Sequence, residues 1–572
     1  MNKRVSNVTG RWLAGLAGSA LLLAAGATTC VAASDAEQTR ERAVDALFAA
    51  MDKPDTPGAA VGIYSEGRVV YKHGYGSALL GRDAPVTTHT VFHVASVSKQ
   101  FTAFAIALLA REGKLDLDRK IGTYLRDLPP FGETVTVRDL VLHTNGLQEV
   151  NTMFWLAQRS RADYLRQQQA LSLIRRQSEL AFEPGTRFNY NNSGYTLLAE
   201  IVRSVSGQTL HQFASARLFE PLGMRQTLFR DDLGEVIPEL AEAYQPAAAG
   251  WRRAVVNSEL VGAAGLYTTV DDLLRWLGNF DRPQVGDRAL IEQICTPGAL
   301  RDGKPLHYAF GLYRQTYAGH DAVAHDGSDW AYHSVVVYLP RERFGVVVLA
   351  NSERDLGAIA RKIIEVYLGK GTASSTVADG AAPPIEPTRQ QVRAMAGHYL
   401  HPYLWAADLV EKDGELWWQS SVMNSAKVTF REGDVLSRPL GTETRYFRIE
   451  RDSRNRIIGF RPLDTIGGGT IELYERKPPV APSLAELRAL EGDYRTAALD
   501  ITYTFKVVDG ALTARSLWSV APIRFQPVAP DRYDANDIPM GSIRFTRNAS
   551  GKPTGFRIVG GGMRGTIFEH LP

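Results

Sequence analysis

The last third of the 572-residue chain repeats itself, and this repeat limits the architecture more than any other feature. Gly397-His398-Tyr399 recurs as Gly492-Asp493-Tyr494, Asp413-Gly414 as Asp509-Gly510, Gly459-Phe460 as Gly555-Phe556, and Gly467-Gly468-Gly469 as Gly560-Gly561-Gly562. Each copy alternates short apolar strands with Asp-Gly or other glycine turns, which is typical of small antiparallel barrels. We therefore predict two barrel domains, over residues 392–478 and 479–572, joined at Pro478-Pro479.

The residues before the repeat predict one larger domain over 34–370. Composition changes at Gly371–Thr376 and Ala381–Pro384, which are rich in small residues and proline and indicate a linker over 371–391. Helical and strand patterns are mixed before this linker. We expect a hairpin of Val61–Ile63 with Val69–Tyr71, a helix over Phe101–Leu109, and a core hairpin of Ser334–Leu339 with Phe344–Leu349.

The net charge of +3 comes entirely from the first 33 residues, which carry Lys3, Arg4 and Arg11 and no acid. The rest of the chain is neutral overall, which removes the electrostatic case for a nucleic-acid partner or an anionic membrane. A basic start, the apolar run Leu13–Ala27 and the small residues Val31-Ala32-Ala33 predict a signal peptide over 1–33 and export to the periplasm or medium. A retained membrane anchor is the alternative, but the run is shorter than the ~20 residues a span needs.

The chain has two cysteines, Cys30 and Cys295. If Cys30 leaves with the signal peptide, no intrachain disulfide is possible, so stability must come from packed cores. Cys295 has no activating neighbours in sequence, and we expect it to be buried or inactive. Trp417-Trp418 could stack on a sugar, but the second copy has Leu512-Thr513 there, which favours a packing position in a strand.

Ser96-Val97-Ser98-Lys99 opens the predicted helix. The Ser-x-x-Lys spacing puts both side chains one turn apart on the same helical face. A serine hydroxyl is a weak nucleophile and needs a neighbouring base, while amides at a helix start suit an oxyanion. We expect Phe101, Phe104 and Ile106 to form an apolar surround that favours a neutral Lys99. The alternative is a plain N-cap serine with an exposed lysine.

Two further motifs follow in order. Tyr190-Asn191-Asn192 lies at the entry to a helix predicted over Tyr195–Val205, and a tyrosine can shuttle protons if nearby cations lower its pKa from about 10. His325-Asp326-Gly327-Ser328 stands just before the strand predicted at Ser334–Leu339. Gly327 would let a substrate backbone approach a strand edge, and the next amide can serve an oxyanion.

Two other tripeptides match the third motif, and His143 could in principle bind a metal, but each has a simpler interpretation. We interpret Lys72-His73-Gly74 and Lys412-Asp413-Gly414 as hairpin turns, and His143 as a buried, hydrogen-bonded histidine, because no other ligand types stand at metal-binding spacing from it.

The ordered trio Ser-x-x-Lys, Tyr-x-Asn and His-x-Gly resembles the penicillin-recognising serine hydrolases, which include class C β-lactamases, DD-peptidases, D-aminopeptidases and related esterases. The strings 139–147 and 264–273 are similar to the same family, and the resemblance covers roughly residues 40–368. It implies an α/β (α+β) catalytic domain with an antiparallel sheet and a helical subdomain. Ser-Asp-Asn is absent from the sequence, so the class A pattern does not fit.

Carried over residue by residue, the resemblance implies that Ser96 accepts the acyl group and that Lys99 is its partner. Tyr190 would be the general base and then the acid to the leaving group, although the sequence leaves open whether Lys99 or Tyr190 takes the serine proton. Asn192 would hydrogen-bond the substrate amide, and the N–H groups of Ser96 and Ser328 would form the oxyanion hole. No metal or other cofactor is implied.

His325 stands where many members of the family have lysine. Histidine is mostly neutral at pH 7 and offers a hydrogen bond, not a permanent charge, to a substrate carboxylate, which weakens the case for a potent β-lactamase. The D-aminopeptidases also have two small barrels after the catalytic domain. Recognition of a free amino terminus would need a carboxylate in the cleft, and Asp326 and Asp329 are the candidates, with solvated turn residues as the alternative.

The leading hypothesis is therefore an exported serine hydrolase that forms an acyl-enzyme with D-amino-acid peptides or related amides, of D-aminopeptidase or D-Ala-D-Ala peptidase type. The partner would be a small peptide, amide or ester, which peptidoglycan could supply, with no nucleic acid and no stable membrane insertion; the oligomeric state stays open. A broad esterase or weak class C-like β-lactamase is the second hypothesis. A cell-wall-binding sensor with a degenerate catalytic domain is the third.

Overall fold

The computed structural model describes residues 35–572, apart from 158–162, 178, 373–381, 423–424, 441–442, 464–471, 518, 520, 538 and 561–562. The predicted signal peptide over 1–33, residues 373–381 of the predicted linker, Gly467-Gly468-Gly469, Gly561 and Gly562 lie outside the described residues. Among the residues described, no helix has the length and apolar content to cross a bilayer.

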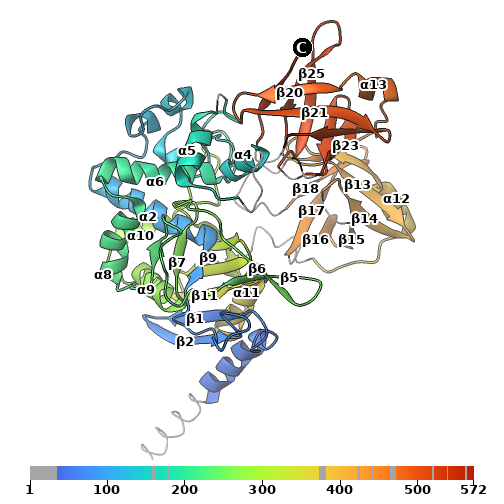
Figure 1. Ribbon diagram of the computed structural model, residues 1–572. Coiled ribbons are helices and arrows are strands. Elements are labelled where there is room, and N and C mark those ends of the chain that lie inside the picture. The colour runs from blue at the N-terminus through green and yellow to red at the C-terminus, as the bar shows by residue number, and fades with distance from the viewer. Residues whose placement is uncertain are drawn as a thin grey trace, which may run out of the picture.

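The predicted catalytic domain is built on a six-stranded antiparallel sheet within the described residues (Figure 1). In spatial order its strands are β2 (Arg68–Tyr75), β1 (Ala59–Ser65), β11 (Phe344–Ala350), β10 (Tyr332–Leu339), β9 (His320–Asp329) and β8 (Tyr313–Tyr317). Both predicted hairpins are present: β1 pairs with β2, and β10 with β11. The strands β10 and β11 are buried on both faces, which explains their unbroken runs of valine and leucine.

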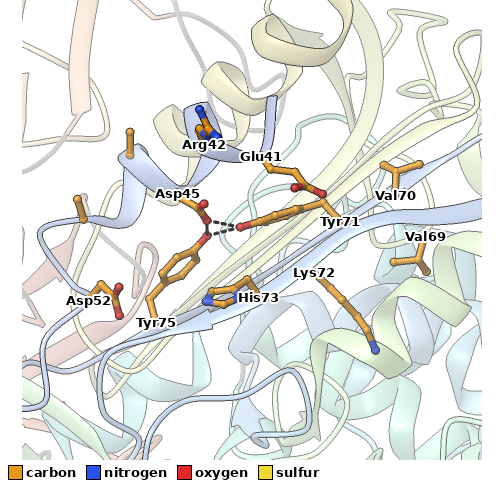
Figure 2. A pocket seen from close by; sticks show the side chains of 12 residues that line it. Glu41, Arg42, Asp45, Asp52, Val69, Val70, Tyr71, Lys72, His73 and Tyr75 are labelled. Carbon is orange, nitrogen blue, oxygen red and sulfur yellow. Dashed lines mark hydrogen bonds between the residues drawn. The ribbon is translucent and has the colours of Figure 1, made fainter. Parts of the chain in front are cut away.

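One face of the sheet is covered by α11 (Leu356–Leu368) and by the helix over residues 35–48. The Phe48 ring stacks on Tyr75 of β2 at 4.5 Å, and the Tyr71 and Tyr75 hydroxyls donate to Asp45. A groove of about 950 Å³ lies beside these contacts (Figure 2), and none of Ser96, Lys99 and Tyr190 lines it. The tripeptide Lys72-His73-Gly74 lies inside β2, so the prediction of a hairpin turn there was wrong.

The opposite face carries the helices. Their bounds are α2 Ser98–Arg111, α3 Val137–Val141, α4 Val150–Leu156, α5 Gln167–Arg175, α6 Asn192–Ser206, α7 Leu210–Ala214, α8 Glu220–Leu222, α9 Val270–Asp281 and α10 Arg288–Cys295. Small strands complete this side: β3 Phe92–His93, β7 Leu266–Thr268 and β4 Leu228–Phe229 in one sheet, β5 Ala243–Pro246 and β6 Trp251–Ala254 in another.

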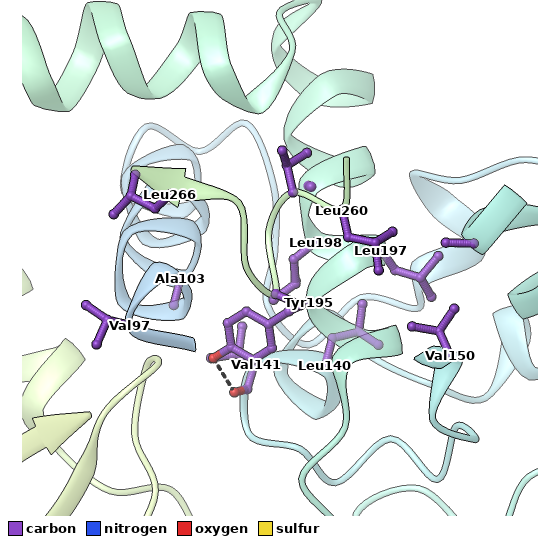
Figure 3. Close-up of a cluster of buried hydrophobic side chains, with 14 of the residues drawn as sticks. Val97, Ala103, Leu140, Val141, Val150, Tyr195, Leu197, Leu198, Leu260 and Leu266 are labelled. Carbon is purple, nitrogen blue, oxygen red and sulfur yellow. Dashed lines mark hydrogen bonds between the residues drawn. The ribbon is translucent and has the colours of Figure 1, made fainter. Parts of the chain in front are cut away.

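The core that holds α2 against α6 is apolar apart from a few satisfied groups (Figure 3). Val97, Leu140 and Leu198 are fully buried there, and so is Tyr195, whose hydroxyl donates to the Val141 carbonyl at 2.9 Å. Burial of a large apolar side chain stabilises a fold by about 1.5–3 kcal/mol, so this cluster holds α2 firmly in place.

Residues 392–572 form two closed antiparallel barrels of eight described strands each, as the repeat predicts. The first contains β12 Gly397–Leu400, β13 Ala407–Lys412, β14 Glu415–Gln419, β15 Ala426–Arg431, β16 Val435–Leu440, β17 Glu443–Arg451, β18 Ile457–Pro462 and β19 Tyr474–Lys477. The second contains β20 Gly492–Thr496, β21 Ile501–Val508, β22 Ala511–Arg515, β23 Ile523–Ala529, β24 Arg532–Ala535, β25 Ser542–Arg547, β26 Pro553–Ile558 and β27 Ile567–His570.

A short helix precedes each barrel, α12 (Arg389–Met395) and α13 (Leu484–Arg488), and each begins with a capping box. The predicted linker 371–391 therefore runs into the first barrel: Ile385 N–H donates to the Phe430 carbonyl, and α12 begins within the linker range. Trp418 points into this barrel and is 2% exposed, which supports the packing interpretation over a sugar platform.

The second barrel lies against α4 and α5 of the catalytic domain (Figure 1). Tyr503 donates to the Leu156 carbonyl at 3.3 Å, Thr566 donates to the Gln148 side chain at 2.9 Å, and Arg557 lies 3.5 Å from Glu179. The two barrels also contact each other, since the Asp534 carboxylate accepts from the Ala406 N–H at 2.6 Å. The barrels are thus fixed to the catalytic domain by specific polar contacts.

Candidate active site

Ser96 lies in a single 3₁₀ turn, Ala95–Val97, directly before α2. The preceding Ala95 has φ of +46°, a left-handed conformation that is unfavourable for alanine and costs on the order of 1 kcal/mol. Ser98 stabilises the turn, since its hydroxyl donates to the Ala95 carbonyl at 2.5 Å and accepts from the Leu266 N–H at 3.1 Å. The turn leaves Ser96 half-buried, where a substrate can reach it.

Lys99 is fully buried beside Ser96. Its Nζ lies 3.0 Å from Ser96 Oγ, 2.8 Å from Asn192 Oδ1 and 2.7 Å from the Ala263 carbonyl oxygen. Burial lowers the pKa of Lys99 to about 7, against the opposing effect of Glu149 and two aspartates. Near pH 7, about half of the molecules therefore have a neutral amine next to the serine hydroxyl.

The surround of Lys99 differs from the prediction. Phe101 and Phe104 contact Trp276 on another side of α2, at ring-centroid distances of 4.4 and 5.1 Å. The rings next to Lys99 Nζ are those of Tyr190 and Tyr195, at 4.7 and 5.6 Å. These residues come from a different segment of the chain, which the pattern of the helix alone does not reveal.

Tyr190 hydrogen-bonds Ser96 and belongs to an aromatic cluster. Its ring lies 4.3 Å from His143 and 6.1 Å from His325. Burial, with a smaller contribution from Tyr313, raises the pKa of Tyr190 well above its ordinary value. The condition named from the sequence, a pKa lowered by nearby cations, is therefore not met, and the phenol keeps its proton at neutral pH and is suited to donate it.

Asn192 begins α6 and connects Lys99 to a residue that the sequence did not single out. Its Oδ1 faces Lys99, while its Nδ2 donates to Glu149 Oε1 at 2.9 Å and its N–H to Glu149 Oε2 at 2.6 Å. Glu149 lies two positions after the Asn-Gly-Leu string that ends at 147, and a lone acid at that point carries no distinctive signal.

His325 is buried and lies within β9, the strand that directly precedes β10, so the motif stands before the predicted strand as expected and is itself part of a strand. Its Nδ1 is 2.6 Å from the Asp326 carbonyl oxygen, which only accepts, so Nδ1 carries the proton and Nε2 the lone pair. Burial, with the nearby Lys99, lowers the pKa of His325 to about 3. The residue is therefore neutral at pH 7, as the sequence suggested, and its Nε2 accepts from the Tyr308 hydroxyl at 3.4 Å.

Gly327 allows β9 to approach the nucleophile. A Cβ at this position would lie 2.3 Å from the Val94 carbonyl oxygen and 3.1 Å from the Ser96 backbone nitrogen. Ser328 follows, exposed, and pairs with His333 of β10. The backbones of Ser96 and β9 are thus adjacent, the arrangement that two N–H groups need to bind one oxyanion.

Asp329 ends β9, and its carboxylate lies 4.0 Å from Nδ1 of the buried His93. His93 Nε2 accepts from the Gly265 N–H at 3.3 Å, so Nδ1 carries the proton, and it has no hydrogen-bond partner among the described residues. Burial raises the pKa of Asp329 to about 7, against the opposing effect of Lys99. Asp329 thus presents an acid that a cationic ligand would keep ionised.

Two other candidates are structural. His143 is fully buried and accepts from the Asn191 N–H at 3.3 Å, as predicted for a hydrogen-bonded histidine. Cys295 is buried, and burial raises the pKa of its thiol to about 12, so it is not a nucleophile at neutral pH. No group of three or more potential metal ligands occurs among the described residues.

Known proteins resemble this chain in sequence and in fold. The family model described as Beta-lactamase matches residues 44–367. A D-aminopeptidase of Cereibacter sphaeroides is 26% identical over 499 residues, covering 85% of this chain and 90% of the relative. A D-aminopeptidase of Gluconobacter oxydans is 28% identical over 364 residues, covering 63% of this chain and 65% of the relative.

A solved structure, the octameric penicillin-binding protein homologue from Pyrococcus abyssi, superposes with a TM-score of 0.54 at 22% identity, covering 75% of this chain and 98% of that protein. This likeness shows a shared fold, and the predicted fold class is confirmed: an antiparallel-sheet catalytic domain followed by two barrels. With its Ser-x-x-Lys pair in contact and the family model matched over most of the catalytic domain, the chain belongs to the β-lactamase family of serine hydrolases.

Proposed function

We propose that this hydrolase cleaves amides and short peptides whose acyl part is a D-amino acid with a free amino group, as a D-aminopeptidase or D-amino acid amidase. The observation that carries the proposal is the charge around the nucleophile. Three carboxylates, those of Glu149, Asp329 and Asp326, act on Lys99, and the position where many relatives have a lysine holds the neutral His325. Such a cleft attracts an ammonium group and repels a carboxylate.

The chemical steps follow from the proton states of the three central residues. Neutral Lys99 takes the proton of Ser96 as Oγ attacks the carbonyl carbon, and the N–H groups of Ser96 and Ser328 stabilise the oxyanion. Tyr190, protonated at rest, gives its proton to the leaving nitrogen as the amide bond breaks, and the Lys99 ammonium restores it. Water then hydrolyses the acyl-enzyme, returning the enzyme to its first state.

Asp329 is the residue we assign to the amino group. It follows Ser328 by one position, and its side chain is 34% exposed, so a substrate can reach its carboxylate. The N–H at Nδ1 of the neutral His93 ring lies 4.0 Å from this carboxylate. An ammonium beside Asp329 would favour the ionised carboxylate, which makes the free-amine substrate bind better than its acetylated counterpart.

A substrate with a free carboxylate in the leaving group, such as a D-Ala-D-Ala peptide, is less favoured. Asp326 is exposed on β9 next to the motif glycine, and the neutral His325 supplies no cation for a substrate carboxylate. The D-configuration is supported by the relatives that are D-aminopeptidases and that align over most of this chain. We also propose export to the periplasm or medium, on the basis of the basic and apolar N-terminus; N-terminal sequencing of the mature protein tests it.

The test compares D-Ala-p-nitroanilide with N-acetyl-D-Ala-p-nitroanilide, L-Ala-p-nitroanilide, a D-Ala-D-Ala peptide, nitrocefin and a butyrate ester. We expect kcat/KM to be at least tenfold higher for the free D-amine than for the acetylated compound. Asp329→Asn should abolish this preference, while Asp83→Asn, an exposed aspartate outside the site, should retain it. Equal rates on the free and acetylated anilides would contradict the proposal, as would a preference for the D-Ala-D-Ala peptide.

A further inference from the structure

Glu149 is the N-cap of α4, and both of its carboxylate oxygens are engaged at the active site. Oε2 accepts from the Asn192 N–H at 2.6 Å, and Oε1 accepts from Asn192 Nδ2 at 2.9 Å and from the Asn151 N–H at 3.3 Å. Because an ionised carboxylate only accepts hydrogen bonds, the nitrogen of the Asn192 amide must face Glu149 and its oxygen must face the other way, toward Lys99.

The orientation of this amide determines what Lys99 can do. A neutral amine has two N–H donors and one lone pair. With Asn192 Oδ1 at 2.8 Å and the Ala263 carbonyl oxygen at 2.7 Å accepting its two hydrogens, its lone pair is directed at Ser96 Oγ, 3.0 Å away. If the amide of Asn192 turned over, its Nδ2 would take up that lone pair, and Lys99 would donate to Ser96 instead of accepting from it.

We propose that Glu149 is a positioning residue of the active site: by fixing the amide of Asn192, it directs the lone pair of Lys99 at the nucleophile. The inference builds on the role of Lys99 as the base, part of the proposed function, and does not depend on which substrate is cleaved.

The second barrel helps to hold Glu149 in place. The adjacent Gln148 is 4% exposed, and its side-chain oxygen accepts from Thr566 at 2.9 Å. Its N–H donates to Gln177 Oε1 at 2.9 Å, and its carbonyl accepts from the Ser193 hydroxyl at 2.5 Å. The segment that carries Glu149 is therefore anchored on three sides, one of them contributed by a barrel.

The experiment exchanges the roles of the two side chains in the full-length protein. In Glu149→Gln, the new side-chain NH2 group faces Asn192 Nδ2, so two donors oppose each other. The Asn192 amide turns over to remove this repulsion, and its oxygen then no longer faces Lys99. In the double variant Glu149→Gln/Asn192→Asp, the carboxylate now at position 192 accepts both from the amide now at position 149 and from Lys99. An acceptor then again faces Lys99, with the same total charge. Glu183→Gln, on an exposed loop, is the matched control.

The readout is the rate of Ser96 acylation by p-nitrophenyl acetate between pH 5 and 9, which requires neither an amino group nor an amide in the substrate. We expect Glu149→Gln to lower the plateau rate at least tenfold and to move the midpoint of the profile to lower pH, because the carboxylate that favours charged Lys99 is gone. The double variant should recover at least half of the loss on a logarithmic scale, and Glu183→Gln should match the wild type.

Loss of the carboxylate moves the midpoint whether or not Glu149 orients Asn192, so the rate of the double variant is the deciding result. A merely structural role would lower the rate without recovery in the double variant, and that result overturns the proposal. If Glu149→Gln does not fold, the comparison of the double variant with Asn192→Asp alone decides, because that single variant places two carboxylates together. A double variant no faster than Asn192→Asp overturns the proposal. If wild-type protein is acylated but cleaves no D-amino acid amide, the proposed substrate fails while the role of Glu149 is still measured.

Discussion

The pH dependence of acylation follows directly from the burial of Lys99. The base must be neutral to take the serine proton, and the pKa of Lys99 is lowered to about 7. The neutral fraction is therefore about half at pH 7 and about 1% at pH 5, so the acylation rate should fall about 100-fold from its plateau on going to pH 5. This loss corresponds to about 2.7 kcal/mol in the barrier.

The assay is rapid quenching of the reaction of p-nitrophenyl acetate with the enzyme, followed by intact-mass detection of the acetyl adduct on Ser96 from pH 5 to 9. Ser96→Ala should give no adduct. Tyr190→Phe should lower the rate but leave the midpoint near 7, because Tyr190 keeps its proton throughout this range.

Two results would refute the reasoning. A profile that is flat from pH 5 to 9 would mean that no titrating base is needed for the step. A midpoint above pH 9 would mean that the buried lysine retains its ordinary pKa or that the tyrosine is the base.

Three further outcomes are expected. Gly327→Ala should reduce acylation at least 100-fold and lower the free energy of unfolding by about 1–3 kcal/mol, because the added Cβ would lie 2.3 Å from a backbone oxygen; an active, equally stable variant in chemical denaturation would contradict this. Cys295 should not react with iodoacetamide in the native protein at pH 8 but should react after denaturation, as mass spectrometry would show; rapid native labelling would disprove its burial. The Tyr403 ring lies between two guanidinium groups, those of Arg187 at 4.8 Å and Arg564 of the second barrel at 4.0 Å from its centre. Tyr403→Leu should therefore lower the free energy of unfolding by about 1–2 kcal/mol, measured by urea titration. An unchanged free energy of unfolding would contradict a stabilising role of this contact.

The sequence was sufficient for the architecture and for the members of the site that belong to motifs. Repeated glycines and Asp-Gly turns predict the two barrels because closed antiparallel barrels need tight turns at regular intervals. Ser96, Lys99 and Tyr190 were predicted together, and the structure brings their side chains into contact.

The rest of the site depends on contacts between distant segments. Glu149 meets Asn192 across 43 residues, and the Ala263 acceptor is a backbone carbonyl, which no side-chain pattern marks. The error about Phe101 has a simple geometric cause: a residue two positions after Lys99 lies on roughly the opposite side of a helix. The protonation of Tyr190 likewise depends on rings supplied by other segments.

The apolar core of the catalytic domain has a consequence for how the chain folds. Buried residues of the second barrel, among them Tyr503 and Phe568, belong to the same contiguous cluster as Phe101 and Leu198. These residues follow the catalytic domain in the chain, so the domain that carries the nucleophile completes this core only after the second barrel has been synthesised. Until then its incomplete face is exposed, and a chain truncated before the last barrel presents that face to aggregation and proteolysis.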